Sequence, residues 1–113
     1  MAKSFVKALT LSPFNSAGLN GNLQAINGTG IAHSCSIFKV INASNVPIII
    51  SYDGVNDNDL VPVGGVLSLE LQTNSSPSGW VAMMRQGTIV YAKSTTGAGG
   101  VGTIYVGGYY QEA

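Results

Sequence analysis

Charged residues are scarce in this chain of 113 residues. Five Lys or Arg and five Asp or Glu amount to 9% of the sequence and leave no net charge, against about 25% charged residues in an ordinary globular domain. Without a basic surplus there is little to displace the counterions of DNA or RNA, so we expect no nucleic-acid binding. Zero net charge also removes the repulsion that keeps protein molecules apart. The composition therefore favours a surface that other protein copies cover.

Cysteine and long apolar runs are also nearly absent. Cys35 is the single cysteine, so an internal disulfide framework is excluded. The longest apolar run, Val46–Ile50, falls far short of the roughly 18 residues that span a membrane. The run Ala8–Leu11 is too short for the apolar part of a signal peptide. We therefore expect neither a membrane partner nor secretion.

Histidine occurs once, which leaves little capacity for catalysis. If His33 and Cys35 shared a strand they would lie on one face, about 7 Å apart, too far for a direct hydrogen bond. Two such ligands are also too few for a closed zinc site. The sequence predicts that the protein is not an enzyme and holds no cofactor.

Two short motifs imitate ligand-binding patterns. Gly97–Gly102 contains G-x-G-x-x-G, but a strand follows it where a nucleotide site needs a helix, so we expect a loop between hairpin strands. Asp53, Asp57 and Asp59 place hard oxygen ligands within seven residues, as calcium prefers, although the spacing is not that of an EF-hand. The alternative is a turn in which aspartate and asparagine side chains bind backbone N–H groups.

Glycine, proline and short β-branched segments are what the chain does contain. There are 15 Gly and four Pro, and turn residues interrupt the sequence about every ten positions, which is typical of an all-β protein. We predict a single domain over residues 1–113, an antiparallel β-sandwich or jelly-roll-like fold of about seven or eight short strands. The expected strands are Phe5–Leu11, Ser36–Asn42, Val46–Tyr52, Asp59–Val63, Val66–Gln72, Thr88–Lys93 and Val101–Tyr110.

The connections between these strands are less uniform. Ser12–Gly30 is rich in Asn and Gly and is predicted to be a long loop with one short pairing around Leu23–Ile26. A turn at Ala43–Asn45 is expected to make a hairpin of its two flanking strands. Trp80–Gln86 fits a strand or a single helical turn. A bulge is expected at Gly107-Gly108.

Two sets of residues are candidates for special roles. The first forms turns and corners, and consists of Asp53, Gly54, Pro62, Gly64 and Gly65. The second is aromatic and is a candidate subunit interface, since tyrosine is enriched at interfaces; it consists of Trp80, Tyr105, Tyr109 and Tyr110. Aromatic faces also stack on sugars, so a carbohydrate-binding or adhesin module is the alternative interpretation.

The order of several short phrases carries a resemblance. Ile41–Gly54 reads INASNVPIIISYDG, and it precedes DND at Asp57–Asp59, VPVGG at Val61–Gly65 and LSLEL at Leu67–Leu71. Gly87–Lys93, Gly102–Val106 and the pair Tyr109-Tyr110 follow. Together these phrases, over roughly residues 36 to 110, resemble small virion proteins of tailed bacteriophages.

The resemblance implies a structural role. It implies a subunit of the head, the neck (collar and head–tail connector) or the tail, or a capsid decoration protein, assembled in the host cytoplasm. Its partners would be copies of itself and other virion proteins. The residues themselves favour the same mode of action, because a low-charge β-sandwich can associate through its surfaces and open strand edges.

Overall fold

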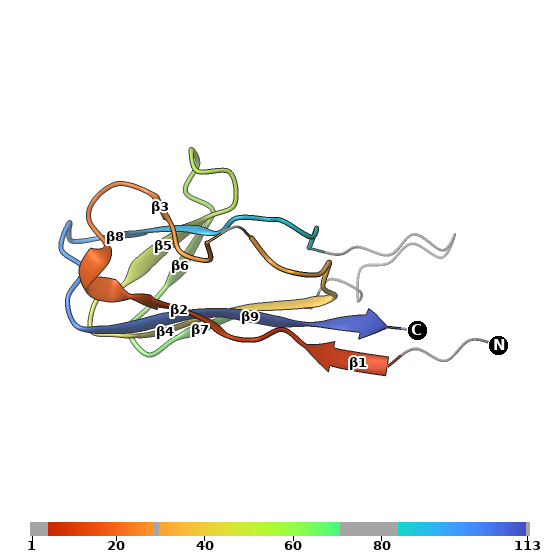
Figure 1. The fold of residues 1–113 in the computed structure, drawn as a ribbon. Coiled ribbons are helices and arrows are strands. Elements are labelled where there is room, and N and C mark those ends of the chain that lie inside the picture. Colours follow the sequence, from red (N-terminus) through yellow and green to blue (C-terminus); the bar gives the residue numbers. More distant parts are fainter. Residues whose placement is uncertain (1–4, 29, 71–83, 113) are drawn as a thin grey trace.

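Two antiparallel β-sheets, packed face to face, make up the fold (Figure 1). The structure is a computed structural model that describes residues 5–28, 30–70 and 84–112, with the backbone alone for Phe5, Gln111 and Glu112. In chain order its elements are β1 (Phe5–Ala8), β2 (Ser12–Asn15), the 3-10 helix η1 (Ser16–Gly18), β3 (Gln24–Ala25), β4 (Ile37–Ser44), β5 (Ile48–Ser51), β6 (Asp59–Val61), β7 (Val66–Glu70), β8 (Tyr91–Ser94) and β9 (Gly102–Glu112).

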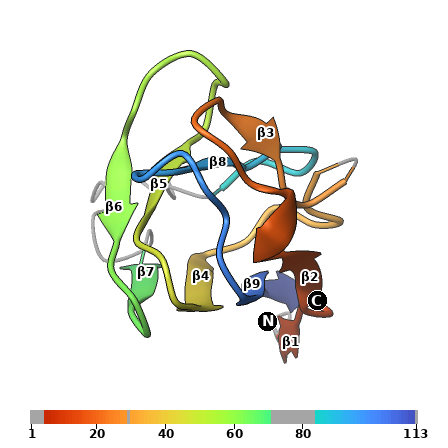
Figure 2. The ribbon, with the colours of Figure 1, turned by 90° about the vertical axis from the view of Figure 1, so that its left-hand side faces the viewer.

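The strand order is that of a jelly roll. One sheet runs β1-β9-β4-β7, with β2 also paired to β9, and the other runs β3-β8-β5-β6. Early strands thus pair with late ones in nested order: β2 with β9, β3 with β8, β4 with β7 and β5 with β6. Figure 2, an end-on view, shows the two layers. The expected all-β sandwich of jelly-roll type is confirmed.

Alternating side chains from both sheets fill the core between the layers. Phe38 and Val40 of β4 and Ile48 and Ile50 of β5 are fully buried. The alternation predicted for the segment from Val66 is confirmed where the structure describes it, because Leu67 and Leu69 pack against this core. Leu71, expected on the same face, lies outside the described residues.

The hairpin expected around Ala43–Asn45 is wrong, because β4 and β5 lie in different sheets. β4 continues to Ser44, and the chain then crosses from one layer to the other. The buried Asn42 side chain directs this crossing by donating to the carbonyl of Val46 at 2.8 Å. Sequence patterning showed two adjacent apolar strands but not that each faces the core from its own layer.

The expected hairpin across Gly97–Gly102 is wrong for the same reason. β8 and β9 belong to different sheets, so this glycine-rich segment is a second crossover between the layers. Both crossovers come together at one end of the sandwich, where Asn45 donates to Val101 O and accepts from Val101 N. The phosphate-binding interpretation gains nothing from this placement, because a strand follows the segment.

A bulge exists near Gly107-Gly108, but it lies in the neighbouring strand. β9 keeps one continuous register against β4, whereas the pairing on its other side shifts by one residue between β1 and β2. Leu9–Leu11 are therefore three residues opposite the two glycines. The strand expected over Phe5–Leu11 consequently ends at Ala8.

The segment expected as a loop from Ser12 to Gly30 carries more structure than predicted. It contains β2, the helix η1 and the two-residue strand β3, which matches the short pairing expected near Leu23–Ile26. β2 was missed because Pro13 and Asn15 are weak strand formers. No helix in the described part of the chain is long or apolar enough to cross a membrane.

Candidate functional site

The Asp53-Gly54 turn is closed by the Asp53 carboxylate. Its Oδ1 accepts the backbone N–H of Val55 and of Asn56, both at 2.8 Å, and these bonds hold the pKa of Asp53 below its usual range. Gly54 has φ +78°, and a Cβ there would lie 3.1 Å from the Tyr91 ring. This is the aspartate turn that was the alternative to a calcium site.

The other two aspartates also have protein partners. Asp57 forms an ion pair of 3.0 Å with Lys93, and Asp59 accepts the hydroxyl of Tyr52 at 2.8 Å, which contributes with burial to a raised Tyr52 pKa. No cluster of three His, Cys, Asp or Glu suited to a metal ion occurs among the described residues. Each of the three carboxylates thus already accepts a hydrogen bond or pairs with a cation.

The Pro62–Gly65 corner is held by Asn42. Gly65 donates to Pro62 O at 2.9 Å, and Gly64 has the left-handed φ of +71° that favours glycine. The Asn42 amide, fully buried, donates to the carbonyls of Val61 and Pro62 at 3.2 Å as well as to Val46. These turn residues therefore hold the two sheets together at the β6–β7 side.

Strand β9 separates the candidate tyrosines. Ile104 and Val106 are buried, so by alternation Tyr110 lies on the inner face, and Tyr105 and Tyr109 lie on the outer face. All three tyrosines are half-buried. Trp80, the fourth member of the predicted interface, lies outside the described residues. Of the described members of the set, Tyr105 and Tyr109 therefore share one face of the sheet, and Tyr110 lies on the other.

The outer face of the larger sheet is partly apolar. A row of directly opposed positions crosses it, with Pro13 opposite Tyr105, Tyr105 opposite Ile41, and Ile41 opposite Val66. Beside this row the Lys39 ammonium lies 5.1 Å from the centre of the Tyr109 ring, a cation–π contact. Among the described residues, Lys39 and Glu70 are the charged side chains that alternation places on this face, so it is weakly charged.

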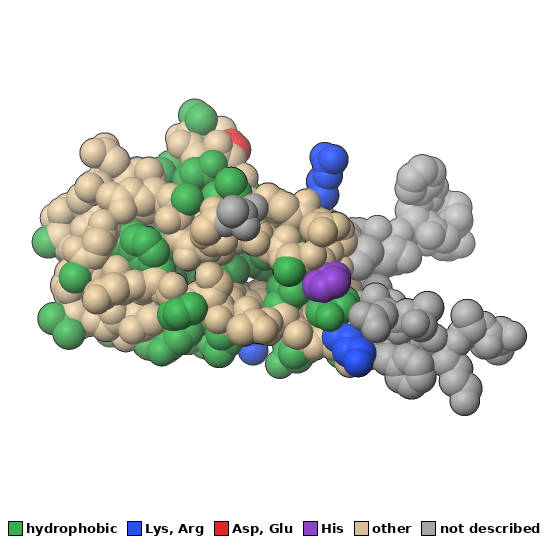
Figure 3. All heavy atoms as spheres, viewed as in Figure 1, with side chains coloured by type: hydrophobic (Ala, Val, Ile, Leu, Met, Phe, Trp, Pro, Cys, Tyr) green, Lys and Arg blue, Asp and Glu red, His purple; other side chains and the backbone are tan. Residues whose placement is uncertain are grey.

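Tyr110 helps to line a small pocket on the inner face of the larger sheet. Its ring stacks on His33 at 4.0 Å between centroids, and both residues line a cavity of about 250 Å³. In Figure 3 the histidine, in purple, lies among apolar side chains near one end of the described surface. The pocket is lined by Ala8, Leu9, Thr10, Ser12, Asn27, Gly30, Ile31, Ala32, His33, Val106 and Tyr110.

The pocket is lined by both apolar and neutral polar side chains. None of its lining residues carries a permanent charge, and Asn27 already donates to Thr88 O and accepts from Val90 N. Cys35, two residues after His33, is fully buried, and burial raises the pKa of its thiol. The lining is that of a site for a small uncharged group.

Three exposed apolar residues were missed by the sequence analysis. Leu60, Val63 and Val66 are 61%, 54% and 59% exposed and belong to the β6–β7 side of the sandwich. The period-two pattern carried a signal for one of them, since Leu67 and Leu69 pointing inward place Val66 outward. The structure adds that all three are exposed, in β6, in β7 and in the turn between these strands.

Comparison with known proteins finds a similar fold but no related sequence family. No protein-family model and no curated protein matches the chain. A solved structure described as "Bacillus endospore appendages form a novel family of disulfide-linked pili" is similar, with a TM-score of 0.50 and 12% identity over 99% of this chain and 93% of that one. At that identity the likeness concerns the β-sandwich architecture alone.

Proposed function

We propose that the chain is a structural subunit of a tailed-bacteriophage virion that acts by binding copies of itself and other virion proteins. Its place would be in the head, neck or tail, after assembly in the host cytoplasm. No catalytic, cofactor or nucleic-acid role is part of this proposal. The phrases at Ile41–Gly54 and Val61–Gly65 support the phage assignment by resemblance.

The observation that carries the proposal is apolar exposure on a weakly charged surface. Seven large hydrophobic residues are at least 45% exposed among the described residues: Val6, Leu11, Val55, Leu60, Val63, Val66 and Val101. The whole chain has only ten charged side chains, so electrostatic repulsion between molecules with such a surface is weak. Contact with other subunits would remove this apolar area from water. The solved structure with a similar fold is described as a pilus, so another protein of this architecture assembles.

Sedimentation velocity and light scattering test the proposal directly. The purified full chain should form a discrete assembly at micromolar concentration, visible by negative-stain electron microscopy. A species of 11.6 kDa that stays monomeric at high concentration would contradict it.

The pocket beside Tyr110 favours a second candidate, a carbohydrate-binding or adhesin module. Its uncharged, mixed lining and aromatic wall suit a single sugar residue. Titration with a broad glycan panel, followed by His33→Ala, tests this candidate. Saturable binding lost in His33→Ala would support it, and silence across the panel would remove it.

A further inference from the structure

We propose that the pocket beside Tyr110 binds a neutral sugar through a methyl-bearing substituent, either the acetyl group of an N-acetyl sugar or the methyl group of a 6-deoxy sugar. This inference rests on the second candidate function, the carbohydrate-binding module, and narrows it to one class of ligand. It starts from the burial of the lining residues, which differs between the apolar and the polar ones.

The floor of the pocket consists of three apolar side chains that belong to the core. Ile31 and Val106 are 6% and 2% exposed, and Leu9 packs against the same core. None of the three side chains can form a hydrogen bond, so a hydroxyl group placed here would leave water without gaining a partner. A methyl group carries no such penalty and gains from leaving water. The floor therefore selects an apolar group.

The rim of the pocket consists of four polar side chains. Thr10 and His33 are exposed, and Ser12 and Tyr110 are half-buried. None of these four side chains makes a hydrogen bond with another described residue. Hydroxyl groups and a neutral imidazole both donate and accept, as the hydroxyl groups of a sugar do. The rim therefore offers a sugar four hydrogen-bonding partners within one small site.

The lining also decides the charge of the ligand. It contains no Lys or Arg that could pair with a carboxylate or a phosphate, and no Asp or Glu that could pair with an ammonium group. Lys7 lies opposite Tyr110 on β1, but it is not part of the lining. Uronic acids, sugar phosphates and amino sugars with a free ammonium group are therefore outside the expected class.

The size of the pocket and its aromatic wall limit the ligand to one sugar ring. The cavity of about 250 Å³ is smaller than the roughly 300–1,000 Å³ of pockets for drug-sized ligands. The rings of His33 and Tyr110 lie within 8° of parallel, with their centroids 4.0 Å apart, so each ring restricts the other. A wall that is ordered before binding loses little freedom when the ligand arrives.

Floor and rim together orient the sugar. The methyl-bearing substituent points toward Ile31 and Val106, and the ring hydroxyl groups stay with Thr10 and His33 at the mouth. Removing one methyl group from water favours binding about fourfold. A plain hexose lacks this contribution, so it should bind more weakly than its methyl-bearing counterpart.

Matched pairs of monosaccharides test the ligand class. Saturation-transfer NMR of the full chain compares N-acetylglucosamine with glucose, and D-fucose with D-galactose, which differs from D-fucose only by its 6-hydroxyl group. The methyl-bearing sugar of at least one pair should bind about fourfold more tightly, with its methyl protons saturated most, and the pair that responds identifies the substituent. Equal affinities within both pairs would overturn the inference. Tightest binding of glucuronate would also overturn it, and would point to Lys7 instead.

Substitutions at the mouth test the location. Ala32 is exposed and lines the pocket, so Ala32→Phe should fill the mouth, leave the core intact and abolish binding. Ala43→Phe, at an exposed alanine of β4 outside the pocket, is the matched control and should bind as wild type does. Circular dichroism checks that both variants fold. Binding that survives Ala32→Phe would overturn the assignment to this pocket.

Removal of one rim hydroxyl provides a second variant that keeps the shape of the side chain. Thr10→Val should weaken binding about fivefold, because a sugar hydroxyl group loses its partner. Thr95→Val, at an exposed threonine outside the pocket, is the control and should leave the affinity unchanged. Equal affinities of the two variants would contradict the role of the rim.

The outcomes separate this inference from the proposed functions. If glucose and galactose bind in the pocket as tightly as their methyl-bearing counterparts, the carbohydrate-binding candidate stands and the ligand class is overturned. If no monosaccharide binds, the inference and that candidate fail together. Self-association is measured separately by light scattering, so the structural role does not depend on either result.

Discussion

Asn42 is a polar residue in the middle of an apolar core, and its amide reaches three carbonyl oxygens from two connections. It also accepts from the N–H and the hydroxyl of Ser44. Because Asn42 has no exposed surface, its own amide N–H and C=O groups would be buried without a partner if these bonds were missing. The asparagine therefore fixes where the chain leaves β4 and where it turns from β6 into β7.

Asn42→Ala should lower the free energy of unfolding by about 3 kcal/mol, since it removes all the hydrogen bonds of a fully buried amide. Urea denaturation measured by circular dichroism checks this. Asn22→Ala, at an exposed asparagine, is the control and should stay within about 0.5 kcal/mol of wild type. Equal effects of the two changes would show that the buried amide has no special role.

Asp53 makes stability depend on pH. Its pKa is lowered in the folded protein by the N–H groups that it accepts, so its contribution is complete above the unfolded value near 4 and is lost as pH falls through the folded value. Between pH 5 and pH 2 wild type should lose more thermal stability than Asp53→Asn. If the melting temperatures of the two proteins fell by the same amount across that range, this role of Asp53 would be refuted.

Strand β9 is the element that organises the larger sheet. It pairs with β1, β2 and β4 along its length. Position 108 accepts only glycine, because a Cβ there would lie 2.5 Å from Ile37 O. The sequence predicted this strand and its glycine pair. It did not show which neighbour carries the extra residue, because a bulge is a property of two strands.

Deletion of Thr10 should bring β1 and β2 into one register, since it removes the extra residue opposite β9. We expect a folded protein whose unfolding free energy is at least that of wild type, and a smaller pocket, because Thr10 lines it. Denaturation and amide hydrogen exchange of Leu9 and Leu11 provide the measurement. Loss of the β1 amide protection would contradict the expected continuous strand.

At the scale of the whole molecule, composition and turn spacing predicted the all-β sandwich. They did not predict which strands each connection joins across the two sheets. Local patterning places Leu67 and Leu69 on one face, but it does not say that the chain after Ser44 changes layers. The same limit applies to the candidate interface. Tyr105 and Tyr110 could be chosen as aromatic, but only their positions on β9 show that they face opposite sides.

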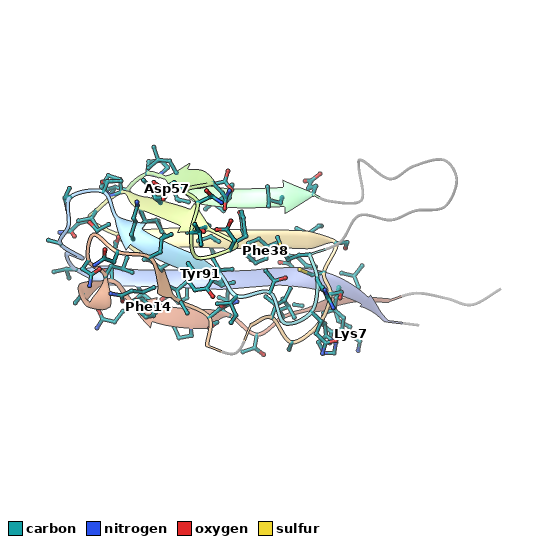
Figure 4. All side chains as sticks on the ribbon, turned by 90° about the horizontal axis from the view of Figure 1, so that it is seen from above. Lys7, Phe14, Phe38, Asp57 and Tyr91 are labelled. Carbon is teal, nitrogen blue, oxygen red and sulfur yellow. The ribbon has the colours of Figure 1, made fainter. Side chains whose placement is uncertain are left out.

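The scarcity of charge predicts how assembly responds to salt. Lys7 on β1 and Asp57 beside β6 lie on different parts of the molecule (Figure 4), and charged residues make up only 9% of the chain. Contacts built from apolar side chains and backbone groups are screened little. Sedimentation in 50 mM and 500 mM sodium chloride should give the same assembly, and dissociation at the higher salt would point to ion pairs instead.

The central position of β9 also bears on synthesis. Ribosomes make β1, β2 and β4 long before β9, so these strands lack their common partner until β9 has been made. Pairings so distant in sequence form slowly, and unpaired apolar strands are prone to aggregate. Completion of this sheet therefore waits for β9, and cells that produce the chain quickly would need chaperones most during that interval.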